Sequence, residues 1–244
     1  KRVGNNPKMK VVVIDPRRTA TCDVADLHLA LKPGSDAILF NGLLNWLHQH
    51  GYSDEQFVAA HTEGLNEALR AAQWFAPTTE AVAQHCELET DDVTTLYQWF
   101  SKIEKTVTVY SQGINQSSSG TDKVNAIINC HLFTGRIGQP GMGPFSVTGQ
   151  PNAMGGREVG ALSNQLAAHI DFDKADIDRV ESFWQAPNMA TMPGLKAVDL
   201  FEALHRGEIK ALWVIATNPA VSMPDANRVR QAMQQCDFLV VSDC

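Results

Sequence analysis

The sequence lacks a long apolar run, a close pair of cysteines and an excess of positive charge. A membrane helix needs about 18 consecutive apolar residues, and no segment of the 244 residues approaches that length. The odd number of cysteines, five, argues against a disulfide framework, and the absence of a C-x-x-C pair argues against iron–sulfur or zinc ligands in this chain. The net charge of −7 argues against a nucleic-acid surface, which needs a concentrated positive field. We therefore expect a globular protein without a membrane or nucleic-acid partner.

Two common nucleotide-binding motifs are also absent. No G-x-G-x-x-G follows a predicted strand, which argues against an ordinary NAD-binding domain. No G-x-x-x-x-G-K-[ST] loop is present either, which argues against an ATPase or GTPase. The eight histidines show no spacing typical of metal ligands, so we predict no metal ligand in this chain.

Segments with strand patterns alternate with segments of helical periodicity. Strands are predicted at 8–14, 27–31, 106–110, 210–216 and 238–241. Helices are predicted from 35 to 51, through 54–104 with breaks near 63 and 77, and at 123–133, 177–184, 198–205 and 226–235. Ser35, Thr90 and Thr121 are predicted helix caps. This alternation predicts an α/β fold with a parallel, doubly wound (Rossmann-like) sheet and additional helices.

In a parallel sheet, ligands bind beyond the carboxyl ends of the strands. Asp15 leaves the first predicted strand, and its carboxylate can accept hydrogen bonds from ribose hydroxyls or a guanine edge. Arg17 and Arg18 could then bind a pyrophosphate; the alternative is a turn with solvated arginines. Asn218 and the pair Ser242-Asp243 also follow predicted strands.

Three further groups of residues have both a structural and a functional interpretation. Ser35 and Asp36 fit a helix cap that could also touch a nucleotide. Gln112 and Gln116 could offer amides to a heterocycle. Arg157 lies in the glycine-rich region Gly135 to Gly160, which we expect to be an irregular functional loop. It could bind an oxyanion substrate, or form a structural pair with Glu158.

Several of these motifs, taken in order, resemble the dimethyl sulfoxide reductase superfamily of molybdopterin oxidoreductases. The resemblance rests on segments 11–19, 25–36, 112–122, 132–138, 149–160, 213–219 and 240–243. It covers nearly the whole chain, and the set of motifs is specific although each motif alone is weak. The superfamily includes formate dehydrogenases and both periplasmic and assimilatory nitrate reductases.

The subtype rests on fewer residues. The run 149–160, which ends in Arg157-Glu158-Val159-Gly160, is similar to nitrate reductases, and most to the bacterial assimilatory kind. Formate dehydrogenases end this loop differently and tend to carry His where this chain has Ser117. The run 120–123, Gly-Thr-Asp-Lys, does resemble formate dehydrogenases. A formate dehydrogenase fragment therefore stays an alternative.

The resemblance implies the cofactor molybdenum bis(molybdopterin guanine dinucleotide). Position by position, it implies cofactor contacts by Asp15, Pro16, Arg17, Arg18, Thr19, Gly34, Ser35, Asp36, Gln112, Gln116, Asn218, Ser242 and Asp243. Arg157 would lie in the substrate funnel with Gln150 near it. Periplasmic nitrate reductases usually have methionine where this chain has Gln112, so this glutamine departs from their pattern.

We expect residues 1–244 to be the middle, cofactor-binding region of a larger enzyme, since both ends look cut from a longer polypeptide. The family's cysteines for a [4Fe–4S] cluster would lie upstream, and its C-terminal cofactor domain downstream. The resemblance implies nitrate as substrate, a flavoprotein, ferredoxin or flavodoxin as electron donor, and a cytoplasmic location. The isolated region is predicted to be inactive. The alternative from another class is a stand-alone nucleotide-binding module without catalysis.

Overall fold

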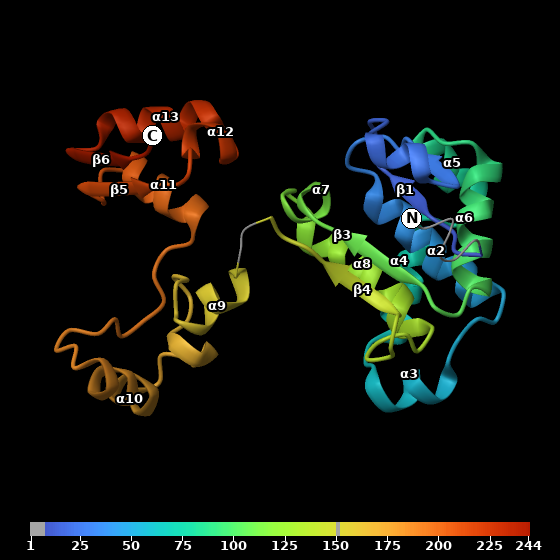
Figure 1. Cartoon of the computed structure of the whole chain (residues 1–244), viewed down its shortest axis with the longest axis horizontal. Helices are drawn as coiled ribbons and strands as arrows, with labels where there is room; N and C mark the ends of the chain where they lie inside the picture. Colours follow the sequence, from blue (N-terminus) through green and yellow to red (C-terminus); the bar gives the residue numbers. More distant parts are fainter. Residues whose placement is uncertain (1–7, 150–151) are drawn as a thin grey trace. The chain divides into compact units, whose positions relative to one another are not determined.

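The computed structural model describes residues 8–149 and 152–244. The chain forms two compact units, Lys1–Gly149 and Gln150–Cys244. Each unit has helices and strands of its own (Figure 1). All six strands in the described ranges are short, at three to five residues.

The N-terminal unit is rich in helices. Its elements are β1 (Val12–Ile14), a 3-10 helix (Ala20–Val24), β2 (Leu27–Leu29), α2 (Asp36–Gln49), α3 (Glu55–His61), α4 (Leu65–Phe75), α5 (Thr79–Cys86), α6 (Thr90–Lys102), β3 (Val107–Tyr110), α7 (Gln112–Asn115), α8 (Gly120–Phe133) and β4 (Gly143–Ser146).

Helix α2 is central to this unit. It contacts α4, α5, α6 and α8, and Leu39, Leu43, Leu44 and Leu47 are almost completely buried along it. Burial of one leucine side chain contributes about 2 kcal/mol. Because the helix is apolar on several faces, it forms the interior of the unit rather than one of its surfaces.

One glycine lets α2 approach its neighbours closely. A Cβ at Gly42 would collide with the Tyr97 hydroxyl and with Val82. Tyr97 is completely buried, and its hydroxyl donates a 2.7 Å hydrogen bond to the Leu39 carbonyl. The close packing of α2 against α5 and α6 therefore needs glycine at position 42.

A buried ion pair joins the starts of α2 and α8. Lys123 Nζ lies 2.7 Å from Asp36 Oδ2, and the two side chains are 4% and 16% exposed. A charge taken out of water is strongly destabilising unless its partner stays with it. The pair therefore fixes the position of one helix start against the other.

A second buried cation holds the end of α6. Arg136 Nη2 donates to the carbonyl oxygens of Phe100 and Ile103, at 2.8 and 3.1 Å, and its guanidinium lies 4.5 Å from the centroid of the Phe100 ring. His131 is fully buried beside it, with Nε2 2.8 Å from Thr108 Oγ1. Desolvation is the main cause that lowers the pKa of His131 to about 4, and repulsion from the Arg136 charge is the second. The imidazole is therefore neutral at pH 7.

The C-terminal unit has fewer buried residues. Its elements are α9 (Ala153–Glu158), a 3-10 helix (Ala167–His169), α10 (Lys174–Trp184), α11 (Ala197–His205), β5 (Ala211–Ile215), α12 (Pro219–Ser222), α13 (Ala226–Gln235) and β6 (Phe238–Ser242). The buried apolar side chains around β5 and its helices are Ala203, Leu204, Val214, Val229 and Ala232.

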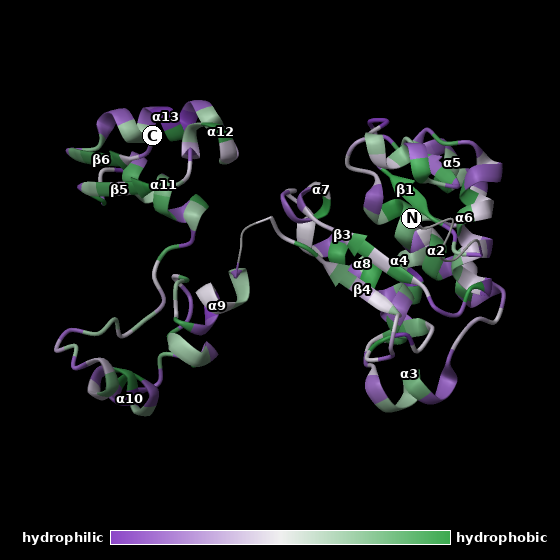
Figure 2. Ribbon diagram, viewed as in Figure 1, coloured by the Kyte–Doolittle hydropathy of each residue, from purple (hydrophilic) through white to green (hydrophobic). Residues whose placement is uncertain are grey.

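The predicted α/β class and parallel pairing are confirmed, with strands pairing as β1–β2, β3–β4 and β5–β6. In the described residues no sheet has more than two strands, so the predicted single doubly wound sheet is not seen there. Parallel sheets are normally covered on both faces, yet Trp213, Ile215 and Phe238 are more than half exposed. Figure 2 shows β5 and β6 as largely hydrophobic.

Some predicted local features are wrong. The region Gly135 to Gly160 is not irregular throughout, because it contains β4 and α9. The prediction of Ser35 as the N-cap residue of α2 is confirmed, although its side chain makes no cap hydrogen bond. Helices α6 and α8 begin at Thr90 and Gly120, so Thr90 and Thr121 lie inside them. In the two described ranges, no helix combines the length and the apolar character needed to cross a membrane.

Replacement of Lys123 by methionine tests the buried ion pair. Lys123→Met leaves the Asp36 carboxylate buried without its partner, so we expect a loss of about 3 kcal/mol in the free energy of unfolding, measured with urea. Lys102→Met is the matched control on an exposed lysine, with an expected change within about 0.5 kcal/mol. The interpretation is wrong if both variants lose the same stability, or if the further change Asp36→Leu does not recover part of the loss.

The neutral, buried His131 predicts a pH dependence of stability. Its folded pKa of about 4 lies below the ordinary value near 6.5, so the unfolded chain binds more protons between these values. The contribution of neutral His131 to the free energy of unfolding is complete above pH 6.5. It decreases as the pH falls toward 4, by about 3 kcal/mol in all. Urea unfolding at pH 7 and pH 5 should show a smaller decrease in His131→Gln than in the unaltered protein. The exposed-histidine variant His85→Gln should keep the full decrease.

Candidate functional site

The first predicted cofactor segment lies at the carboxyl end of β1–β2. The backbone N–H of Asp15 donates to the Leu29 carbonyl at 3.2 Å, and the His28 ring nitrogen Nε2 lies 2.9 Å from the Asp15 carbonyl oxygen. These contacts hold the loop after β1 beside the end of β2. Because the two strands are parallel, the segments Asp15–Thr19 and Gly34–Asp36 leave the same edge of this sheet.

Within the first loop, one arginine is free to bind a ligand. Asp15 Oδ1 accepts a 2.7 Å bond from the Arg17 N–H, which folds the loop into a turn. Arg18 pairs with Asp23 at 3.3 Å, and the Thr19 hydroxyl lies 3.8 Å from Cys22 Sγ. The exposed guanidinium of Arg17 has no recorded partner among the described residues, and Pro16 is also exposed.

In the second segment, Gly34–Asp36, the glycine lies beside open space, while the next two side chains already have partners within the chain. Gly34 has a φ of +91°, and a Cβ at this position would meet no atom within 4 Å. Ser35 is buried, and its hydroxyl donates to the Lys32 carbonyl at 2.7 Å. Asp36 is paired with Lys123. Both side chains thus have structural roles, and their contact with a nucleotide stays a prediction.

Gln112 and Gln116 lie at the carboxyl end of β3. Gln112 is the first residue of the short helix α7, and Gln116 is its C-cap residue. Both are exposed, and neither side chain has a recorded hydrogen bond in the described part of the chain. The Ser111 hydroxyl donates to the Val147 carbonyl at 2.7 Å and so ties this turn to the segment after β4.

Arg157 lies on α9, which several contacts hold in place. Asn152 caps the helix by accepting from the Gly155 N–H, and the Gln165 amide donates to the Arg157 carbonyl at 2.7 Å. Gly160 has a φ of +76°, and a Cβ there would collide with the backbone of Ala167. The Arg157 guanidinium is exposed, and no pair with Glu158 is recorded. Gln150, its predicted neighbour, lies outside the described residues.

The third cluster lies at the carboxyl end of β5–β6. Ala216 takes a φ of +54° directly after β5, a left-handed conformation that costs a non-glycine residue about 1 kcal/mol or more. This turn leads to Asn218, whose exposed amide has no recorded partner among the described residues. Ser242 is the last residue of β6 and Asp243 follows it, and both are also exposed. Parallel pairing thus brings these three predicted residues to one edge.

Three residues with a role at these edges were missed from the sequence. His28 supports the Asp15 carbonyl, Lys123 pairs with Asp36, and the Trp213 indole donates to Ser242. Each acts on a residue distant in the sequence. No local pattern therefore indicated them.

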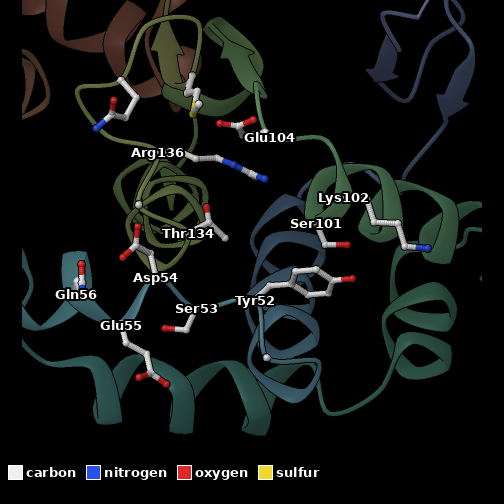
Figure 3. A pocket seen from close by; sticks show the side chains of 14 residues that line it. Tyr52, Ser53, Asp54, Glu55, Gln56, Ser101, Lys102, Glu104, Thr134 and Arg136 are labelled. Carbon is white, nitrogen blue, oxygen red and sulfur yellow. The ribbon is translucent and has the colours of Figure 1, made fainter.

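A cavity of about 840 Å³ opens elsewhere in the N-terminal unit, and it contains none of the predicted site residues. Its charged lining combines Lys102 and Arg136 with Asp54, Glu55 and Glu104. Figure 3 shows the Arg136 side chain between Glu104 and Thr134. Arg136 already binds the end of α6, and three carboxylates outnumber the two cations of the lining, so this cavity does not favour an anion.

In residues 8–149 and 152–244, no group of three or more His, Cys, Asp or Glu side chains could hold a metal ion.

Comparison with known families gives one match, in which the molybdopterin oxidoreductase model covers residues 1–244. The chain belongs to the molybdopterin oxidoreductase family. It is 51% identical over 240 residues to a nitrate reductase of Klebsiella oxytoca and 47% identical to one of Shewanella frigidimarina, with 98% of the chain covered in each.

The chain spans about a quarter of the length of these relatives, 27% and 25%. Among solved structures it is similar to acetylene hydratase from Pelobacter acetylenicus. The TM-score is 0.70 at 17% identity, with 99% of this chain and 35% of that chain covered. At this identity the likeness shows the fold alone.

The exposed edges fit a molybdopterin cofactor in their chemistry. Such a cofactor carries phosphate and heterocyclic groups, which need cationic and amide partners. Arg17, Gln112, Gln116 and Asn218 are exposed, and none has a recorded side-chain partner in the ranges described. They lie at the carboxyl ends of parallel strands, where α/β proteins bind such ligands.

Neutralisation of Arg17 tests this assignment in the intact molybdopterin oxidoreductase. Arg17→Gln removes a fork of donors suited to phosphate oxygens, so we expect cofactor release to become about tenfold faster. Molybdenum and released cofactor would be measured over time after gel filtration. Arg70→Gln is the control, since Arg70 is an exposed arginine that pairs with Glu67. Equal release rates from Arg17→Gln and Arg70→Gln would remove Arg17 from the site.

Proposed function

We propose that this chain is the middle, cofactor-binding region of a nitrate reductase that converts nitrate into nitrite. The observation that carries the proposal is a set of exposed polar side chains at the carboxyl ends of the parallel strands, Arg17, Gln112, Gln116 and Asn218, for which no side-chain partner is recorded in the described ranges. The identity of 51% and 47% to two nitrate reductases supports the substrate. We further assign the enzyme to nitrate assimilation, on the resemblance of residues 149–160.

The cofactor in this proposal is molybdenum bis(molybdopterin guanine dinucleotide). Asp15–Thr19 and Gly34–Asp36 would hold a guanosine and a pyrophosphate, with Arg17 as the principal cation. Gln112 and Gln116 would face the pterin, while Asn218, Ser242 and Asp243 would bind dinucleotide groups. Contacts distant from the metal would thus fix the orientation of the cofactor.

Arg157 would bind nitrate. Its guanidinium is a planar fork that matches the oxygens of a planar oxyanion, and it is exposed without a recorded carboxylate partner in the described ranges. It would hold the substrate and stabilise negative charge on the oxygens during reduction. Gln150 would lie near it and add an amide.

The chemistry supplied by the bound molybdenum cofactor is two-electron removal of one nitrate oxygen, which leaves as water after uptake of two protons. The metal ligand, a [4Fe–4S] cluster and a further cofactor domain would lie in other parts of the enzyme. The electrons would come from a flavoprotein, ferredoxin or flavodoxin. The location would be cytoplasmic. Further strands and helices of the enzyme would extend the two-stranded sheets into doubly wound ones and cover Trp213, Ile215 and Phe238.

Substitution of Arg157 tests the substrate role. In the intact enzyme, Arg157→Gln should lower kcat/KM for nitrate by about 100-fold or more, because a charge-stabilising donor is lost. Nitrite formation would be measured with a reduced viologen dye as electron source. Glu158→Gln changes the next residue on α9 and should keep activity within a few fold.

Two outcomes would contradict parts of the proposal. Unchanged nitrate reduction in Arg157→Gln would remove the residue from the substrate site. Absence of nitrite from molybdenum-loaded intact enzyme would reject nitrate, and formate oxidation would then be assayed in the same preparation.

A further inference from the structure

One side-chain hydrogen bond crosses the β5–β6 sheet at its ligand-facing end. Trp213 pairs in register with Val240, and Ile215 pairs with Ser242. The Trp213 indole reaches diagonally along the sheet, and its Nε1 donates to Ser242 Oγ at 2.9 Å. Indole nitrogen is only a donor, so the direction of this bond is fixed.

This direction sets what the Ser242 hydroxyl can still do. A hydroxyl has one hydrogen to donate and two lone pairs to accept with. The indole uses a lone pair, and no other partner of Ser242 Oγ is recorded in the described ranges. The hydroxyl hydrogen is therefore free to donate to a group outside the chain.

Ser242 lies at the edge where β5 and β6 end. The Ala216 N–H lies 3.4 Å from the Ser242 carbonyl oxygen, so the turn with positive φ at Ala216 is anchored beside this serine. The same turn leads to Asn218, whose backbone carbonyl accepts from Val221 and Ser222. Asn218 thus lies in the segment after β5, and Ser242 is the last residue of the paired strand β6.

The indole of Trp213 does more than pack against the sheet. Its Nε1 binds the side chain of Ser242, the last residue of β6. This bond uses one lone pair of Ser242 Oγ and limits the rotation of the side chain, while the hydroxyl hydrogen stays available.

We propose that Trp213 is a positioning residue that orients the Ser242 hydroxyl, and that the free hydrogen of this hydroxyl is donated to an acceptor on the ligand, an oxygen of the nucleotide part of the cofactor. The inference rests on the proposed function, which places the dinucleotide against Ser242. It adds the residue that orients the Ser242 hydroxyl and the chemical kind of the group bound there.

Paired variants of the intact, cofactor-loaded enzyme test the inference through the rate of cofactor release. Ser242→Thr keeps a hydroxyl, while Ser242→Val has the same shape without one. We expect Thr to match the unaltered protein and Val to release cofactor about two- to tenfold faster. Trp213→Phe keeps a ring but removes the donor, and should also accelerate release about two- to tenfold. Since Trp213→Phe is expected to act only through the orientation of the Ser242 hydroxyl, Trp213→Phe combined with Ser242→Val should release cofactor no faster than Ser242→Val alone.

The outcomes separate the inference from the proposed function. Equal release from the Thr and Val variants would mean that Ser242 does not bind the cofactor, which contradicts that part of the proposed function. Two results would overturn the role of Trp213 alone, provided that the Thr and Val variants release cofactor at different rates. One is an unchanged release rate in Trp213→Phe. The other is a double variant in which the two accelerations multiply.

A second measurement applies if Trp213→Phe does not fold. In enzyme with nitrogen-labelled tryptophan, the indole N–H resonance of Trp213 should shift in Ser242→Val and keep its position in Ser242→Thr. An unshifted resonance in Ser242→Val would show that no bond of this kind exists, and would overturn the inference without any use of the Phe variant.

Discussion

Parallel pairing of short strands is the constraint on which the candidate site depends. A parallel pair cannot be closed by a tight turn, so the chain must cross back before it forms the second strand. Both strands then end at the same edge. The residues after β1 and β2 meet there, as do those after β5 and β6. Polar residues far apart in the sequence therefore gather at strand ends without any long loop to hold them.

The two units differ in how their apolar side chains are buried. The N-terminal unit buries α2 on several faces and fixes the start of that helix with the Lys123–Asp36 pair. The C-terminal unit exposes Trp213, Ile215 and Phe238 on its two-stranded sheet. A parallel sheet is stable when both faces are covered. These exposed side chains are therefore consistent with a region that functions inside a larger enzyme.

The distribution of charge separates structural cations from candidate ligand-binding ones. Arg136 and Lys123 are buried, and each binds a group at a helix end. Arg17 and Arg157 are exposed, with no acidic partner recorded in the described part of the chain. A buried arginine bound to carbonyls stabilises the fold, whereas an exposed and unpaired one can bind an anion at little desolvation cost. The geometry of each arginine thus indicates its role better than its place in a motif.

The sequence by itself determined the local elements and the candidate loops. Helix α13 has the predicted bounds, 226–235, and the strand at 211–215 lies inside the predicted one, because periodicity and β-branched runs are local signals. The tertiary structure alone decided β4, which exists through pairing with β3. It also decided the bonds from Lys123 to Asp36 and from Trp213 to Ser242. Such contacts depend on how distant segments are brought together, and short-range sequence patterns carry no information about that.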